Sequence, residues 1–77
     1  MTASQYLQSL YGLRRANLQV VCTRKGLPQA PMAEILGMTQ SLLNQYLKGT
    51  ATINETRARR IEHALGMEYG ALDKEGA

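Results

Sequence analysis

The sequence of 77 residues contains no tryptophan and no phenylalanine, and Cys22 is its single cysteine. One cysteine cannot form an internal disulfide, and without a second cysteine or a nearby histidine it predicts neither a metal site nor a nucleophile. The longest apolar run is too short for a membrane-spanning helix, and the N-terminus lacks the apolar stretch of a signal peptide. These absences predict a protein of the reducing cytoplasm with no membrane partner.

The chain also lacks the residue groups on which catalysis usually depends. Paired carboxylates, a glycine-rich phosphate loop and a triad-like set are all missing, and so short a chain has little room for a shielded active site. We therefore expect no enzymatic activity, no metal and no cofactor. The net charge of +3 permits an acidic partner. Many ordinary domains are equally basic, so the charge alone identifies no partner.

Apolar residues recur at spacings of three and four along the chain, and runs of β-branched residues that mark strands are absent. The length suits one domain, residues 1–77, with a modest core. We predict an all-α fold, a compact bundle of four to five short helices. The expected core includes Leu18, Val21, Ala33, Leu36, Leu43, Ile61 and Leu65.

The boundaries of these helices are predicted from glycines, prolines and capping residues. A helix should run to Lys25, just before Gly26, and residues 1–11 should form an N-terminal extension with a short helix of its own. Gly12 is expected to break or bend the join between the two. The later helices are expected at 29–36, 39–48 and 54–65, followed by a short turn at 67–72. The tail "DKEGA", which begins at residue 73, is expected to fray, with 74–77 as the frayed end.

Residues 29–49 have the pattern of a helix-turn-helix motif, in which two short helices are joined by a turn that contains a glycine. Gly37 allows the positive φ of such a turn, and Thr39 is a good N-cap for the second helix. In that helix the apolar face consists of Leu43, Tyr46 and Leu47, and the opposite face of Gln40, Ser41, Asn44, Gln45 and Lys48. The second helix of this motif normally enters the major groove of DNA.

The polar face of the second helix is rich in amides and has one cation, Lys48. Gln and Asn amides present a donor and an acceptor side by side, which matches the N6 and N7 edge of adenine. A face built only for solubility would more usually carry Lys and Glu. The pattern therefore favours double-stranded DNA as the partner over a neutral solvent face.

The stretch "QAPMAEILGMTQSLLNQYLKG" resembles the motif of the lambda-repressor-like family, which includes phage repressors, Cro proteins and xenobiotic-response-element regulators. The later stretch "INETRARRIEHALGMEYGALD" resembles the segment that follows the motif in LexA-like, self-cleaving phage repressors. The resemblance implies the fold of that family and DNA binding. Pro28, Leu47 and Ala71 depart from the usual residues, and Pro28 removes the ordinary N-cap of the first motif helix.

The resemblance also implies roles for single residues. It places Gln29 where the family contacts a phosphate and braces the first recognition residue, and Leu42 where a side chain can contact a thymine methyl. The positions that touch bases in the family are Gln40, Ser41 and Gln45, and those that more often touch the DNA backbone are Asn44 and Lys48. The full set of expected DNA-binding residues is Gln29, Thr39, Gln40, Ser41, Leu42, Asn44, Gln45, Lys48 and Thr50.

The function indicated by these residues is sequence-specific DNA binding by a transcriptional regulator, a phage or prophage repressor or a Cro-like protein on a palindromic operator. Two alternatives stay open: a helix-turn-helix antitoxin that also binds a toxin, and a protein-interaction module that has lost DNA binding. The cluster "TRARRIE" is expected to form a solvated or ion-paired face with a pair between Arg59 and Glu62. The other cations, Arg14, Arg15, Arg24 and Lys25, suit long-range attraction to DNA or an ordinary surface equally well.

Regulators that read DNA with one helix usually bind as two-fold dimers. Two apolar surfaces are candidates for a weak homodimer contact, and either can instead be local cover for the core. The favoured C-terminal surface consists of Met67, Tyr69 and Leu72, and the N-terminal one of Tyr6, Leu7, Leu10 and Tyr11.

Overall fold

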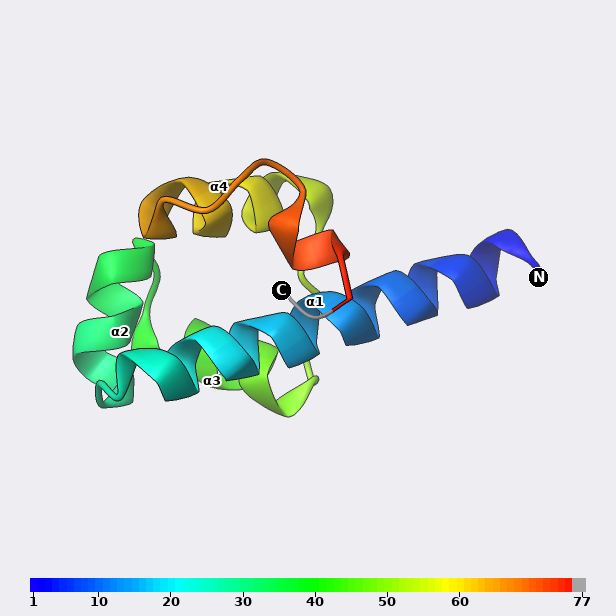
Figure 1. Ribbon diagram of the computed structural model, residues 1–77. Coiled ribbons are helices and arrows are strands. Elements are labelled where there is room, and N and C mark those ends of the chain that lie inside the picture. The colour runs from blue at the N-terminus through cyan, green and yellow to red at the C-terminus, as the bar shows by residue number, and fades with distance from the viewer. Residues whose placement is uncertain (76–77) are drawn as a thin grey trace.

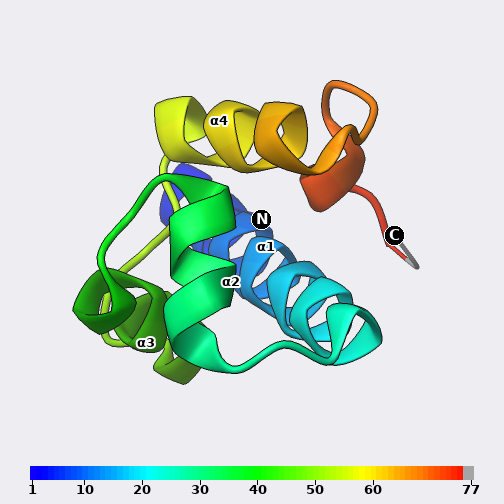
Figure 2. The same cartoon turned by 90° about the vertical axis from the view of Figure 1, so that its left-hand side faces the viewer.

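The computed structural model describes residues 1–75 and contains four α-helices and a final 3-10 turn. The elements are α1 (Ala3–Lys25), α2 (Gln29–Leu36), α3 (Gln40–Lys48), α4 (Glu55–Leu65) and η1 (Ala71–Asp73). No strand occurs among the described residues, and the predicted all-α bundle is confirmed. In Figures 1 and 2, α3 and α4 lie on opposite sides of the bundle. The last two residues of the tail that was expected to fray, 76–77, lie outside the described residues.

The N-terminal prediction was wrong, because α1 is one continuous helix of 23 residues. Thr2 and Gln5 form a reciprocal capping box in which each side-chain oxygen accepts a hydrogen bond from the other's backbone N–H, at 3.1 and 2.9 Å. Gly12 lies inside the helix without a positive φ. A glycine in a helix costs only about 1 kcal/mol relative to alanine, which a capped and long helix tolerates.

The predicted turn between α2 and α3 is confirmed in detail. Gly37 has a φ of 71°, and the Thr39 hydroxyl oxygen accepts a hydrogen bond from the Leu42 N–H at 3.1 Å. Pro28 precedes α2 and supplies no side-chain cap, as expected from its departure from the family pattern. Residues 37–39 therefore form the turn that joins the two motif helices.

The core contains most of the residues expected there and several more. Val21 and Leu65 are only half-buried, because they border an open groove of about 360 Å³. Ile53 and Leu72 are buried although they lie outside the main helices. The buried apolar residues are Leu18, Met32, Ala33, Leu36, Leu43, Tyr46, Ile53, Ala58, Ile61 and Leu72.

Arg14 is buried, with 2% of its surface exposed, so its placement among surface cations was wrong. Its Nε donates to Asp73 Oδ1 at 2.6 Å, its Nη2 to Glu55 Oε2 at 2.8 Å, and its Nη1 to the carbonyl of Ile53 at 2.9 Å. Arg59 Nη2 adds a second bond to Asp73, at 2.7 Å. Asp73, the first residue of the tail that was expected to fray, is therefore held by two arginines.

A second buried set of polar groups holds the backbone of the C-terminal turn. The Glu62 carboxylate accepts from the N–H groups of Gly70 and Leu72, each at 2.9 Å. Asn17 Nδ2 donates to the carbonyls of Leu72 and Lys74, each at 2.8 Å. Leu72 is 0% exposed as a result, which contradicts its prediction as a dimer contact. It belongs to the core of the single chain.

Candidate nucleic-acid interface

The orientation of α3 follows from its apolar face. Leu43 and Tyr46 are buried and Leu47 is half-buried against the core. The opposite face is exposed and carries Gln40, Ser41, Gln45 and Lys48. The structure therefore places the predicted polar face of α3 on the surface of the molecule.

The N-terminal end of α2 lies beside this face. Gln29, at the start of α2, accepts a hydrogen bond from Asn44 Nδ2 through its Oε1, at 3.3 Å. The resemblance had implied that Gln29 braces the first recognition residue, Gln40, but its bond is to Asn44. A shallow hollow of about 360 Å³ is lined by Gln29, Gln40, Ser41, Asn44 and Gln45.

The side chains that line this hollow differ in how free they are. Within residues 1–75, the side chains of Gln40, Ser41 and Gln45 make no hydrogen bond to the protein, so their donors and acceptors are available to a ligand. Asn44 and Gln29 are held in place by their mutual bond. The arrangement has three free hydrogen-bonding groups beside a braced pair.

The other expected contact residues take structural positions around α3. Thr39 uses its hydroxyl oxygen as the N-cap, and Leu42 is half-buried against the core. Thr50 is exposed and its hydroxyl donates to the Gln45 carbonyl at 3.4 Å. Lys48 lies in the last turn, where a cation interacts favourably with the helix dipole.

Two residues of α1 hold the C-terminal end of α3, and neither bond was predicted from the sequence. Arg15 Nε and Gln19 Nε2 both donate to the Leu47 carbonyl, at 3.1 and 2.8 Å. Gly49 has a φ of 82°, and a Cβ there would lie 3.0 Å from Arg15 Nη1. The position of α3 therefore depends on α1 as well as on the motif turn.

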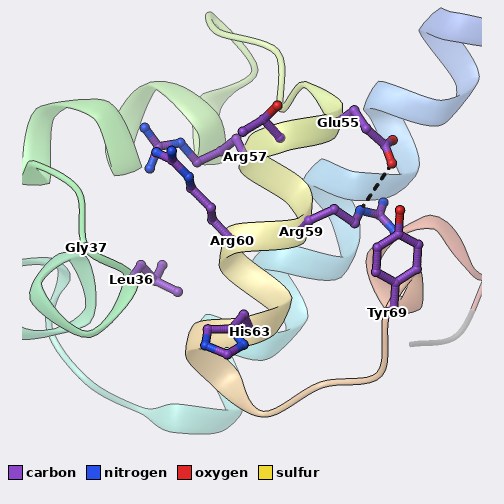
Figure 3. A pocket seen from close by; sticks show the side chains of 9 residues that line it. Leu36, Gly37, Glu55, Arg57, Arg59, Arg60, His63 and Tyr69 are labelled. Carbon is purple, nitrogen blue, oxygen red and sulfur yellow. Dashed lines mark ion pairs between the residues drawn. The ribbon is translucent and has the colours of Figure 1, made fainter.

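The cluster "TRARRIE" lies on α4, on the side of the bundle opposite α3 (Figures 1 and 2). Figure 3 shows its three arginines, Arg57, Arg59 and Arg60, around an open groove of about 630 Å³. The predicted pair is present, because Arg59 Nη1 lies 3.4 Å from Glu62 Oε1. The ion-paired form of the prediction is therefore the one observed, with Glu62 1% exposed and the Arg59 guanidinium over the Tyr69 ring, 4.7 Å from its centroid.

Other kinds of site find no support in the described part of the chain. Residues 1–75 contain no group of three His, Cys, Asp or Glu side chains that could hold a metal ion. None of the described helices has the length and apolar character needed to cross a membrane. Cys22 is half-buried, and burial raises the pKa of its thiol, which makes the thiolate scarcer at neutral pH.

Comparison with known proteins agrees with this geometry. Residues 19–72 match a family model described as helix-turn-helix. A chain in the crystal structure of the Rep-Ant complex from a Salmonella temperate phage is 33% identical, with a TM-score of 0.81. The alignment covers 86% of the present chain and 40% of that chain, so this chain spans less than half the length of that relative. No curated protein sequence matches.

Proposed function

The chain belongs to the lambda-repressor-like family of helix-turn-helix proteins, a family of DNA-binding regulators, and from that premise we propose that it binds a specific double-stranded operator through α3. The observation that carries the proposal is the exposed face of α3, where Gln40, Ser41 and Gln45 have unused hydrogen-bonding groups. An α-helix fits the width of the major groove, and these groups suit base edges. The function requires neither catalysis nor a cofactor.

The proposed roles follow from where each side chain lies. Gln40, Ser41 and Gln45 read bases, and the half-exposed part of Leu42 lies near a thymine methyl group. The remaining residues, Gln29, Thr39, Asn44, Lys48 and Thr50, position the protein on the DNA backbone. The bond between Gln29 and Asn44 makes a phosphate contact at the start of α2 more rigid.

We propose a phage or prophage repressor or a Cro-like protein as the kind of regulator, acting in the cytoplasm of a bacterial or phage-infected cell. The support is the similarity to a chain of a temperate-phage complex. We further propose that two copies bind an inverted repeat, because one recognition helix reads only a few base pairs. Half-sites then lie about 10–10.5 base pairs apart, centre to centre.

Selection of bound duplexes from a random DNA pool tests the proposal directly. We expect an enriched inverted repeat, and we expect a Gln40→Ala, Gln45→Ala double variant to lose this enrichment while its circular dichroism spectrum is unchanged. His63→Ala is the matched control, since His63 is exposed on α4, on the opposite side of the bundle. Enrichment of no sequence, or equal enrichment by the double variant, would contradict the proposal.

A further inference from the structure

The first turns of α1 project from the bundle without packing on it (Figure 1). Every residue from 1 to 9 is exposed, and Leu10 is the first that is half-buried. The side-chain hydrogen bonds that join α1 to other elements all come from Arg14 and residues after it. We call residues 3–10 the α1 overhang.

The α1 overhang has an apolar stripe that nothing in the described chain covers. Tyr6 is 56% exposed and Leu7 is 44% exposed. Leu10 lies on the same helix face, four residues after Tyr6 and three after Leu7. A helical segment as short as residues 3–10 is marginally stable on its own, and most helices gain their stability by packing an apolar face. The exposed stripe therefore indicates a partner surface.

The charge of the overhang favours a second copy of the chain as that partner. No charged side chain lies between Thr2 and Leu13, and the next residue, Arg14, is buried. Helices that bind membrane surfaces or nucleic acid carry Lys or Arg on their polar face, and the overhang has none. A second copy offers an equally uncharged face, and a two-fold contact uses the same patch on both chains.

We propose that the α1 overhangs of two copies pack antiparallel around a two-fold axis near Tyr6 and Leu7. On DNA, this contact would hold the α3 helices of the two copies on either side of the axis. Only that consequence rests on the proposed function. The chain extends 38 Å along its longest axis with the overhang included, a length comparable to the roughly 34–36 Å between half-sites one helical turn apart. The overhang contact replaces the C-terminal surface as the proposed dimer interface, because Leu72 of that surface is buried.

The first test measures self-association by analytical ultracentrifugation across a wide range of concentrations. The wild-type protein should shift from monomer to dimer as concentration rises, and Leu7→Glu should stay monomeric, since two like charges would meet at the axis. Ile35→Glu is the matched control, because Ile35 is 45% exposed against 44% for Leu7 and lies on α2. Equal dimerisation of Leu7→Glu and the wild type would overturn the proposal.

The second test separates this proposal from the proposed function, using a half-site duplex and a full inverted repeat. Leu7→Glu should bind the half-site as tightly as the wild type but lose cooperative binding to the full site, on the order of tenfold or more in affinity. Cooperative binding retained by Leu7→Glu would overturn the overhang contact. Sequence-independent binding by every variant would instead contradict the proposed function and leave the ultracentrifugation result to decide the dimer.

Cross-linking locates the contact. In a Cys22→Ala background, Leu7→Cys should form a disulfide-linked dimer on mild oxidation, because residues near a two-fold axis meet their own copies. Ile35→Cys should form far less. Equal cross-linking at both positions would overturn the proposed axis, as would Leu7-dependent binding to vesicles of phosphatidylcholine and phosphatidylglycerol by a chain that remains monomeric.

Discussion

Arg14 is a charged side chain almost wholly removed from water, and its surroundings explain why the fold accepts it. Burying a charge is costly unless the charge is paired and its hydrogen-bonding groups are satisfied. Arg14 bonds to the Ile53 carbonyl and Glu55, at the start of α4, and to Asp73 in η1. The hydrogen bond from Arg14 is the main cause that lowers the pKa of Asp73, and the bond from Arg59 acts in the same direction.

The lowered pKa of Asp73 predicts an acid-sensitive contribution to stability. The folded protein keeps the Asp73 carboxylate charged at a pH where the unfolded chain already binds a proton. Its contribution to the free energy of unfolding is therefore complete above the ordinary aspartate pKa of about 4, and it is lost as the pH falls through the lowered pKa of the folded protein. Asp73→Asn should lower the free energy of unfolding by about 1.5–3 kcal/mol at pH 7. The difference from wild type should shrink below about pH 4.

Urea unfolding at a series of pH values measures this difference. Glu34→Gln is the control, because Glu34 is exposed and forms no ion pair in the described residues. A constant difference between Asp73→Asn and wild type from pH 7 to pH 3 would show that the carboxylate charge does not stabilise the fold.

Gln40 is the residue-scale test of base reading, since its amide is exposed on the first turn of α3. Gln40→Ala should weaken binding to the selected operator by about 1–3 kcal/mol and relax the preference at one base pair. Fluorescence anisotropy with the operator and with single-base variants of it measures both effects. Unchanged affinity for the selected site would remove Gln40 from the residues that read bases.

At the scale of elements, local signals predicted the motif but not the length of α1. Gly37 and Thr39 lie within the turn that they define, so the position of α3 and its exposed face could be predicted from spacing alone. Gly12 was overinterpreted, because a glycine lowers helix stability without ending a helix. The capping box at Thr2 was a sequence signal that could have shown where α1 begins.

Contacts between distant residues could not be predicted in the same way. Arg14 lies 59 residues from Asp73, and Gln19 lies 28 residues from Leu47. Side-chain spacing within one helix contains no information about which carboxylate or carbonyl of another element will face it. Consequently the buried charges and the brace on α3 became visible only in the folded chain, and so did the burial of Leu72.

Gly12→Ala tests the continuity of α1. A Cβ at this position meets nothing within 4 Å, and the backbone has no positive φ, so alanine should fit without strain. We expect the free energy of unfolding to rise by about 0.5–1 kcal/mol, as for glycine to alanine in a helix interior. Thermal melting followed by circular dichroism measures this change, and a loss of stability would mean that residue 12 is a true break.

At the scale of the whole molecule, the cations are divided between the two sides of the bundle. Lys48 is exposed on α3, beside the proposed DNA contacts. Arg60 is exposed on α4, on the opposite side, where it lines the groove of Figure 3. Replacing either Lys48 or Arg60 by alanine lowers the net charge of +3 by one. A comparison of the two variants therefore separates a local phosphate contact from the effect of overall charge.

The salt dependence of DNA binding distinguishes these two cations. A contact between a cation and a phosphate releases counterions, and each such contact adds about 0.9 to the slope of log affinity against log salt. Lys48→Ala should therefore weaken binding to all sequences and flatten the slope by about one unit. Arg60→Ala, which removes the same charge far from the proposed interface, should leave the slope nearly unchanged because charges beyond about 10 Å are screened at 0.1 M salt. Equal slopes for the two variants would mean that net charge, and not the placement of Lys48 on α3, governs the attraction to DNA.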